Sequence, residues 1–207
     1  MDARPHPNLA GILLVLALGG CVSGPFEATP PQRRAAELYP AAQERHQVVA
    51  AVDALAGAER AKRQFGAPLP KADILAVNII ITNRGDRPVR IGPKNVLLEG
   101  GGIVADRVPL NTVTHAILDH QGRHTRAFAK EVRSYLEEQA FRELVLAPGR
   151  SYRGTMFFTT ARRKDPPPPY LFGSSEGRYT VRVMAVTPRT GRTIEFVPFP
   201  VAVPEDA

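Results

Sequence analysis

The sequence predicts a mainly β fold in which two antiparallel sheets form a sandwich with one helical insertion. Roughly seven or eight short segments alternate apolar and polar residues, and Gly, Pro, Asn and Asp gather between them. The chain lacks the regular succession of strand and helix that a parallel sheet requires. Because each such strand has one apolar face, two packed sheets are the arrangement that buries these faces.

Residues 1–20 have the pattern of a signal peptide. Arg4 and the free amino group precede an uncharged run at residues 9–18. A membrane-spanning helix needs about 20 apolar residues, and this run is shorter and ends in two glycines. We therefore predict that the chain is exported from the cytoplasm and that residues 1–20 are removed.

Cys21 follows this run directly and is the only cysteine of the chain. The segment Leu18-Gly19-Gly20-Cys21 resembles the lipobox of bacterial lipoproteins, in which an aliphatic residue and two small residues precede an invariant cysteine. The resemblance implies that Cys21 becomes an acylated N-terminus, and two or more acyl chains anchor a protein stably. In such lipoproteins an Asp directly after the cysteine resembles an inner-membrane retention signal, and this chain has Val22 there instead. We therefore expect the protein to be anchored in the outer membrane, on its periplasmic side.

Residues 21–40 are expected to form a lipidated tether and residues 41–66 an amphipathic helix. The tether is rich in proline and shows no apolar periodicity, as in a mobile linker. Further on, Val48, Val52 and Leu55 recur at helical spacing in a segment rich in Ala, Glu, Arg and Gln. This helix either packs against its own domain or docks a partner.

Residues 71–207 are expected to form the β-sandwich domain. Its strongest predicted strand is 74–83, where the apolar period changes from 3.6 to 2. A turn at 83–86 follows, and Gly85 is expected to supply a positive φ there. Three further short strands are predicted at 88–91, 95–99 and 103–107.

A helix and two hairpins complete the predicted domain. Apolar residues recur four apart over 128–143, so this helix would cover an end or an open edge of the β body. The first predicted hairpin joins 144–146 to 152–159 through a Pro-Gly turn. The second joins 178–186 to 192–203.

Two segments resemble immunoglobulin-like accessory domains of bacterial lipoproteins. The strand at 77–83 ends in an Asn-x-Gly-Asp turn, and a Pro-Gly turn at 148–149 precedes a strand with Gly154 and a Phe-Phe pair. The resemblance implies an immunoglobulin-like sandwich. The Cys and Trp of antibody domains are absent, since the chain has no Trp and its one Cys precedes the body.

The chain carries a formal net charge of +7 and has a sequence pI of about 10.0. Such a charge is typical of proteins that bind nucleic acid, but an exported chain does not ordinarily encounter nucleic acid. The densest basic group is Arg162, Arg163 and Lys164, next to the proline run 166–169 and Tyr170. Because prolines pre-order a contact surface, we predict that this segment binds another envelope protein or an anionic envelope polymer.

Two motifs resemble catalytic or metal sites. Residues 173–177 match Gly-x-Ser-x-Gly, but a strand-like segment follows Ser175 where a nucleophile elbow requires a helix. His115, His120 and His124 could offer imidazoles to a metal, although polar residues of a loop are the simpler interpretation.

We therefore expect a non-catalytic lipoprotein of the cell envelope that binds or scaffolds another envelope component and needs no cofactor. Two alternatives stay open: an accessory lipoprotein of a secretion, pilus or transport machine, and a metal-dependent envelope enzyme that uses the three histidines.

Overall fold

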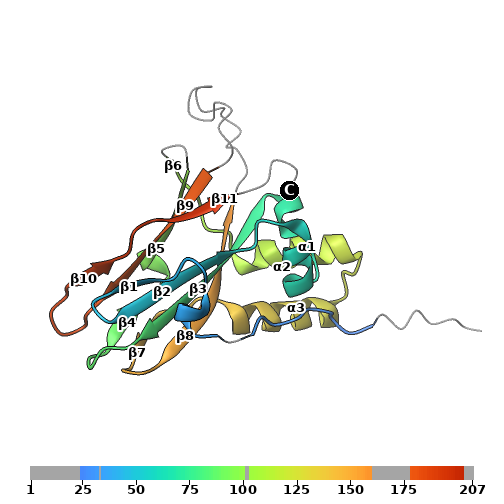
Figure 1. Ribbon diagram of the computed structural model, residues 1–207. Coiled ribbons are helices and arrows are strands. Elements are labelled where there is room, and N and C mark those ends of the chain that lie inside the picture. Colours follow the sequence, from blue (N-terminus) through green and yellow to red (C-terminus); the bar gives the residue numbers. More distant parts are fainter. Residues whose placement is uncertain (1–23, 33, 101–102, 160–177, 203–207) are drawn as a thin grey trace, which may run out of the picture.

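The computed structural model describes residues 24–32, 34–100, 103–159 and 178–202 (Figure 1). They form a mainly β fold in which two antiparallel sheets face each other, as predicted, and three α-helices lie against one of the sheets. The strands are β1 Gln43–Arg45, β2 Val48–Ala54, β3 Ile74–Asn83, β4 Val89–Ile91, β5 Val96–Gly100, β6 Ile103–Val104, β7 Leu144–Leu146, β8 Ser151–Thr159, β9 Arg178–Val186, β10 Thr193–Glu195 and β11 Phe199–Ala202. The helices are α1 Ala58–Phe65, α2 Leu110–Gln121 and α3 Arg126–Gln139, with 3-10 turns η1 Ala36–Leu38, η2 Leu69–Ala72 and η3 Pro93–Asn95.

The first sheet has the order β1-β2-β3-β8, and all ten residues of β3 are buried. Leu75, Val77, Ile79 and Ile81 face the second sheet, as the alternation predicts. The other face of β3 is covered as well, by helices at one end and by the N-terminal segment at the other. Burial on both faces explains why this strand reads as an almost continuous apolar run.

The second sheet is built around β9, which pairs with β4, β5, β10 and β11. The predicted C-terminal hairpin is therefore correct, although its second arm is divided into β10 and β11. The predicted hairpin of β7 and β8 is wrong, because β7 pairs with β4 in the second sheet and β8 pairs with β3 in the first. The turn between them crosses from one sheet to the other. The immunoglobulin-like arrangement stays a prediction.

The predicted helix at 41–66 is wrong for most of its length. Residues 43–54 form the β1–β2 hairpin, and helix begins only at Ala58 and ends at Gly66, whose φ is 71°. β2 pairs with β3 at seven positions, from Val48↔Asn83 to Ala54↔Val77. Strand pairing to a buried neighbour thus outweighs the helical preference of an Ala-rich segment.

The predicted helix at 128–143 is confirmed as α3, whose N-cap Thr125 accepts a hydrogen bond from the backbone N–H of Phe128 at 3.3 Å. α2 was not predicted. Its buried residues are few, and the polar residues between them hide the helical period. No helix of the described residues is long and apolar enough to cross a membrane.

The N-terminal segment packs on the body from Phe26 onward, which contradicts the prediction of a mobile linker as far as residue 40. Phe26 packs edge-on against Phe128 and Tyr135, and Ala36 is fully buried in a cluster on the outer face of β3. The predicted domain boundary at residue 71 also cuts through the first sheet, because β1 and β2 precede it.

Candidate binding surface at the loop end

Several predicted site residues lie outside the described residues. They are the lipidation residue Cys21, the predicted contact residues Arg162, Arg163, Lys164 and Tyr170, and Ser175 of the Gly-x-Ser-x-Gly motif. Their roles stay predictions.

The three candidate histidines lie at the end of the molecule that carries the helices. His115 and His120 are exposed on α2 and line an open depression of about 450 Å³ between η2 and α2, together with Lys71 and Asp119. His124 lies beyond α2, with its Nε2 3.8 Å from the Asp119 carboxylate. Within the described ranges no group of three His, Cys, Asp or Glu side chains could hold a metal ion.

Four turns meet at the opposite end of the sandwich (Figure 1). They are 45–48 between β1 and β2, 84–88 between β3 and β4, 147–150 between β7 and β8, and 187–192 between β9 and β10. The backbone N–H of Arg84 donates to the carbonyl of Gln47 at 2.7 Å, and that of Gly149 donates to the carbonyl of Asn83 at 2.7 Å. These four turns are called the loop end below.

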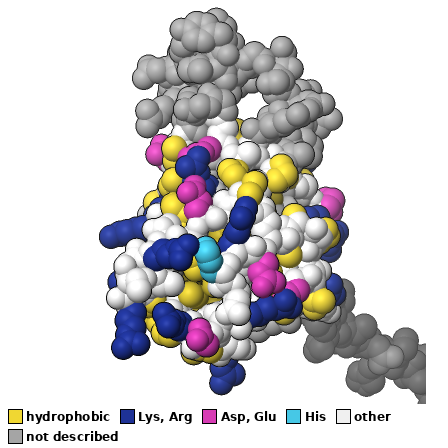
Figure 2. Space-filling view, turned by 60° about the vertical axis from the view of Figure 1, so that its left-hand side comes forward, with side chains coloured by type: hydrophobic (Ala, Val, Ile, Leu, Met, Phe, Trp, Pro, Cys, Tyr) yellow, Lys and Arg dark blue, Asp and Glu magenta, His cyan; other side chains and the backbone are white. Residues whose placement is uncertain are grey.

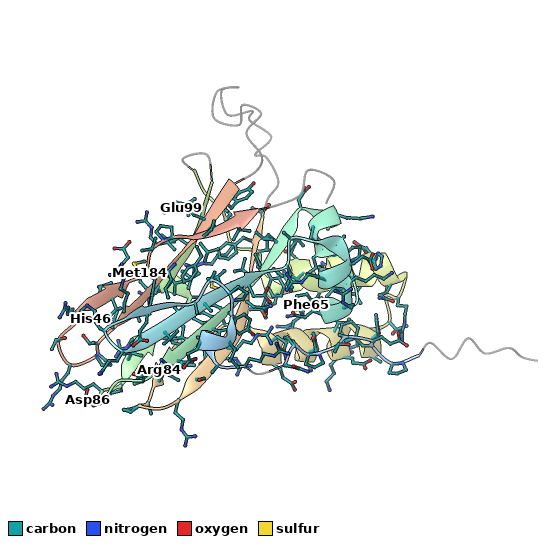
Figure 3. All side chains as sticks on the ribbon, viewed as in Figure 1. His46, Phe65, Arg84, Asp86, Glu99 and Met184 are labelled. Carbon is teal, nitrogen blue, oxygen red and sulfur yellow. The ribbon has the colours of Figure 1, made fainter. Side chains whose placement is uncertain are left out.

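The loop end is strongly basic. Its exposed arginines are Arg45, Arg84, Arg87, Arg150, Arg189 and Arg192, against the carboxylates of Glu44 and Asp86. Figure 2 shows Lys and Arg side chains spread over this end of the molecule, and Figure 3 shows His46, Arg84 and Asp86 far from Phe65 in the helical layer.

Only some of these arginines are paired. The Arg84 guanidinium contacts Glu37 at 2.7 Å and Glu44 at 3.4 Å. Arg45, Arg87, Arg150 and Arg189 have neither a carboxylate nor another side-chain partner among the residues that the structure describes, and the Arg192 side chain contacts only His46. Four guanidinium groups thus stand ready to form paired hydrogen bonds with carboxylates or phosphates of another molecule.

Asn83 holds the 84–88 turn in place. Its side chain is fully buried; Oδ1 accepts from the backbone N–H of Gly85 at 3.0 Å, and Nδ2 donates to the carbonyls of Arg87 at 2.8 Å and Leu146 at 3.0 Å. Gly85 does not adopt the predicted positive φ, because the chain crosses here to the other sheet and closes no hairpin. The Asn83 side chain makes the turn instead.

The β1–β2 turn is strained. His46 and Gln47 have φ values of 49° and 62°, in the left-handed region that glycine and asparagine adopt most easily. Each such residue costs roughly 1–2 kcal/mol. His46 Nε2 lies 3.3 Å from Nη2 of Arg192, so the strained turn contacts the β9–β10 turn. Strain of this kind at a surface motivates a search for function.

A polar seam lies under the covered face of the first sheet. Asn78 is fully buried there, and its Oδ1 accepts from Thr155 Oγ1 at 2.7 Å and from Gln64 Nε2 at 3.2 Å. Next to it, Nε and Nη2 of Arg153 are buried and find no hydrogen-bond partner in the described part of the chain. Burial lowers the pKa of the Arg153 guanidinium, and the charge of Asp53 opposes this shift.

Neither the loop end nor the seam was predicted from the sequence. The arginines of the loop end lie up to 147 positions apart, from Arg45 to Arg192 (192 − 45), and only the strand order brings them together. The seam had a signal that could have been used, because Asn78 and Arg153 interrupt apolar strands at the positions that alternate with the core residues.

No protein-family model matches this chain, and no curated protein matches it. Among solved structures, a similar one is the ycdA protein of Bacillus subtilis subsp. subtilis, which is proposed to be a lipoprotein; its TM-score is 0.41 at 10% identity, covering 78% of this chain and 38% of that one. A FixG-related protein from Vibrio parahaemolyticus has a TM-score of 0.36 at 9% identity, covering 75% and 95%. The yjhA protein of Bacillus subtilis has a TM-score of 0.30 at 12% identity, covering 54% and 56%. Likenesses of this degree transfer no function to the chain.

Proposed function

We propose that this chain is a lipoprotein of the bacterial cell envelope, anchored by acyl chains on Cys21, and that it works by binding. Its loop end receives an acidic surface of another envelope protein. The observation that carries the proposal is the set of four loop-end arginines that have no side-chain partner among the described residues. The anchor is supported by the lipobox-like segment that ends at Cys21.

The build of the loop end suits recognition. Its turns are held by the hydrogen bonds of the Asn83 side chain and by the bond that the Arg84 backbone N–H donates to the Gln47 carbonyl, so little conformational entropy is lost when a partner binds. Unpaired charge of one sign also speeds the encounter with an acidic partner.

A protein partner fits better than an anionic polymer. The arginines come from four separate turns and spread over a broad area, whereas a polymer chain follows a line. Val145, which is 53% exposed, lies opposite the exposed Arg90 in the β4–β7 pair, beside the loop end. Apolar area next to arginine is typical of protein interfaces.

Photo-crosslinking in cells tests the proposal. A crosslinking amino acid at Ala147 or Thr190, both exposed at the loop end, should capture one and the same protein. The same group at Lys94, which is exposed on η3, should not capture it. Protease-resistant, heterogeneous adducts at the loop end would instead identify an anionic polymer and contradict a protein partner.

A charge-reversal set provides the matched comparison. Exchange of Arg87, Arg150 and Arg189 for Glu should abolish the adduct, and the same exchange at Lys62, Lys71 and Lys94 should leave it intact. Each set changes the net charge by the same amount. If both sets weaken capture equally, the loop end is not the binding surface.

Two further variants separate the remaining hypotheses. Cys21→Ala should release the protein from the membrane fraction, and retention would contradict the anchor. Exchange of His115, His120 and His124 for Ala should leave function intact. Loss of function together with loss of stoichiometric metal from a folded protein would favour the metal-dependent enzyme.

A further inference from the structure

The N-terminal segment is fixed to the helical layer close to its beginning. The Phe26 ring lies 5.9 Å from that of Phe128 and 5.3 Å from that of Tyr135, between ring centroids. The backbone N–H of Phe26 donates to Glu131 Oε1 at 3.1 Å, and that of Thr29 donates to the carbonyl of Arg63 at 2.9 Å.

Gly66 completes this seat. A Cβ on Gly66 would lie 2.9 Å from Cε2 of Phe26, so the ring fills the space that the glycine leaves. Phe26 is therefore held between α1 and α3, and Figure 1 shows the segment running along α3 toward the α2–α3 turn.

The chain between Cys21 and Phe26 is short. Five peptide steps separate the two residues, and five residues span at most about 18 Å even when fully extended. Acyl chains on Cys21 would lie in the bilayer, so the seat of Phe26 has to lie close to the lipid headgroups.

We propose that the end of the molecule at residues 122–130, called the helical end, faces the membrane and contacts anionic lipid headgroups. This inference rests on the acyl anchor of the proposed function. It names the membrane-facing surface, which the anchor alone does not, because a long mobile linker would allow every orientation.

The charges at the helical end fit this assignment. Arg126 and Lys130 are exposed, and the Arg123 guanidinium lies 3.6 Å from the ring centroid of Phe128, on which it stacks. Two of the carboxylates nearby have contacts of their own, since Asp119 Oδ1 lies 3.8 Å from His124 Nε2 and Glu131 accepts from the backbone N–H of Phe26. Cations within a Debye length of an anionic leaflet are attracted to it.

In this orientation the helical end contacts the membrane and the loop end is free to bind a partner. Figure 1 places the loop end opposite the α2–α3 turn, so a body held at its helical end presents the loop-end arginines away from the bilayer. A partner then reaches them from the aqueous compartment and not from within the same membrane surface.

Quenching of single fluorophores measures this orientation in the lipidated, full-length protein. Acylation blocks Cys21, so Ala127→Cys at the helical end and Ala147→Cys at the loop end, both exposed, can be labelled singly. In vesicles of phosphatidylethanolamine and phosphatidylglycerol with nitroxide-labelled headgroups, the label at 127 should be quenched several-fold more than that at 147. Equal quenching, or stronger quenching at 147, overturns the proposal.

Two variants test the cause. Insertion of about ten Gly and Ser residues between Ser23 and Gly24 leaves every described residue unchanged and gives the body a free linker. Phe26→Ala removes the ring from its seat, and Leu38→Ala, at a position 68% exposed, is its control. The insertion and Phe26→Ala should each reduce the quenching difference toward none, and Leu38→Ala should keep it.

The outcomes separate this inference from the anchor. Protein that fails to float with the vesicles contradicts acylation of Cys21 and with it the orientation. Protein that floats but keeps the full quenching difference after the insertion shows that the short chain does not set the orientation.

Discussion

His46 and Gln47 occupy a two-residue turn whose positive φ values favour the pair Asn-Gly. Replacing them with Asn and Gly should therefore stabilise the protein. We expect His46→Asn with Gln47→Gly to raise the free energy of unfolding by about 1–3 kcal/mol, measured by urea denaturation. Gly191→Ala is the calibrating variant. Its φ is 65° and its Cβ would meet no atom within 4 Å, so only backbone strain should lower stability, by about 1 kcal/mol. No gain in the double variant would contradict strain at this turn.

Glu37 should make stability depend on pH. Burial alone would raise the pKa of its carboxyl, but hydrogen bonds with its own backbone and with Arg84 outweigh burial and hold the pKa below its ordinary value. The ionised carboxylate therefore stabilises the folded state above the unfolded pKa of about 4.3, and this contribution is lost as the pH falls through the folded pKa.

Comparison with Glu37→Gln measures this contribution. The variant should be less stable by about 0.5–1 kcal/mol at pH 7, and the difference should shrink toward zero in acid below about pH 4. Glu44→Gln is the control, because its contact with Arg84 is longer, at 3.4 Å, and half exposed. A difference that persists unchanged in acid would assign the effect to packing and not to charge.

Among the elements that precede residue 71, β2 is the one whose removal should lower stability most. A fragment of residues 71–207 loses β1, β2 and α1, so β3 becomes an edge strand and Phe157 and Ile74 lose part of their cover. We expect this fragment to aggregate or to unfold without cooperativity, whereas residues 24–207 stay folded. Size-exclusion chromatography and thermal circular dichroism decide between the two. If the 71–207 fragment were monomeric and unfolded in a sharp thermal transition, the pairing of β2 with β3 would not be required for folding.

The elements that sequence periodicity predicted are those whose apolar residues are dense and regular. Ile79 and its neighbours in β3 gave such a pattern, and so did Phe128, Val132 and Leu136 of α3. β2 was mistaken for helix because alanines fit either structure and only its pairing with β3 decides. At the scale of one element, tertiary contacts were the missing information.

At the scale of the whole molecule, the candidate site could not be predicted because it belongs to no single segment. Arg45, Arg87 and Arg189 come from three turns, and nothing local in the sequence joins them. The turn residues themselves were visible, as at Asn83, but their meeting follows from the order of strands in two sheets. The docked Phe26 was missed for the same reason, since its seat is made by α1 and α3.

The central place of β9 in its sheet also sets an order of events when the chain is synthesised. The first sheet and all three helices are encoded before residue 160, but β9, which joins β4 and β5, begins only at Arg178. Until β9 is synthesised, the inner face of β3 lacks much of the second sheet against which it packs. Such long-range closure is slow to form and leaves apolar surface exposed meanwhile. We therefore expect a chain that ends before β9 to expose apolar surface of the first sheet and to be more sensitive to proteases than the full-length chain.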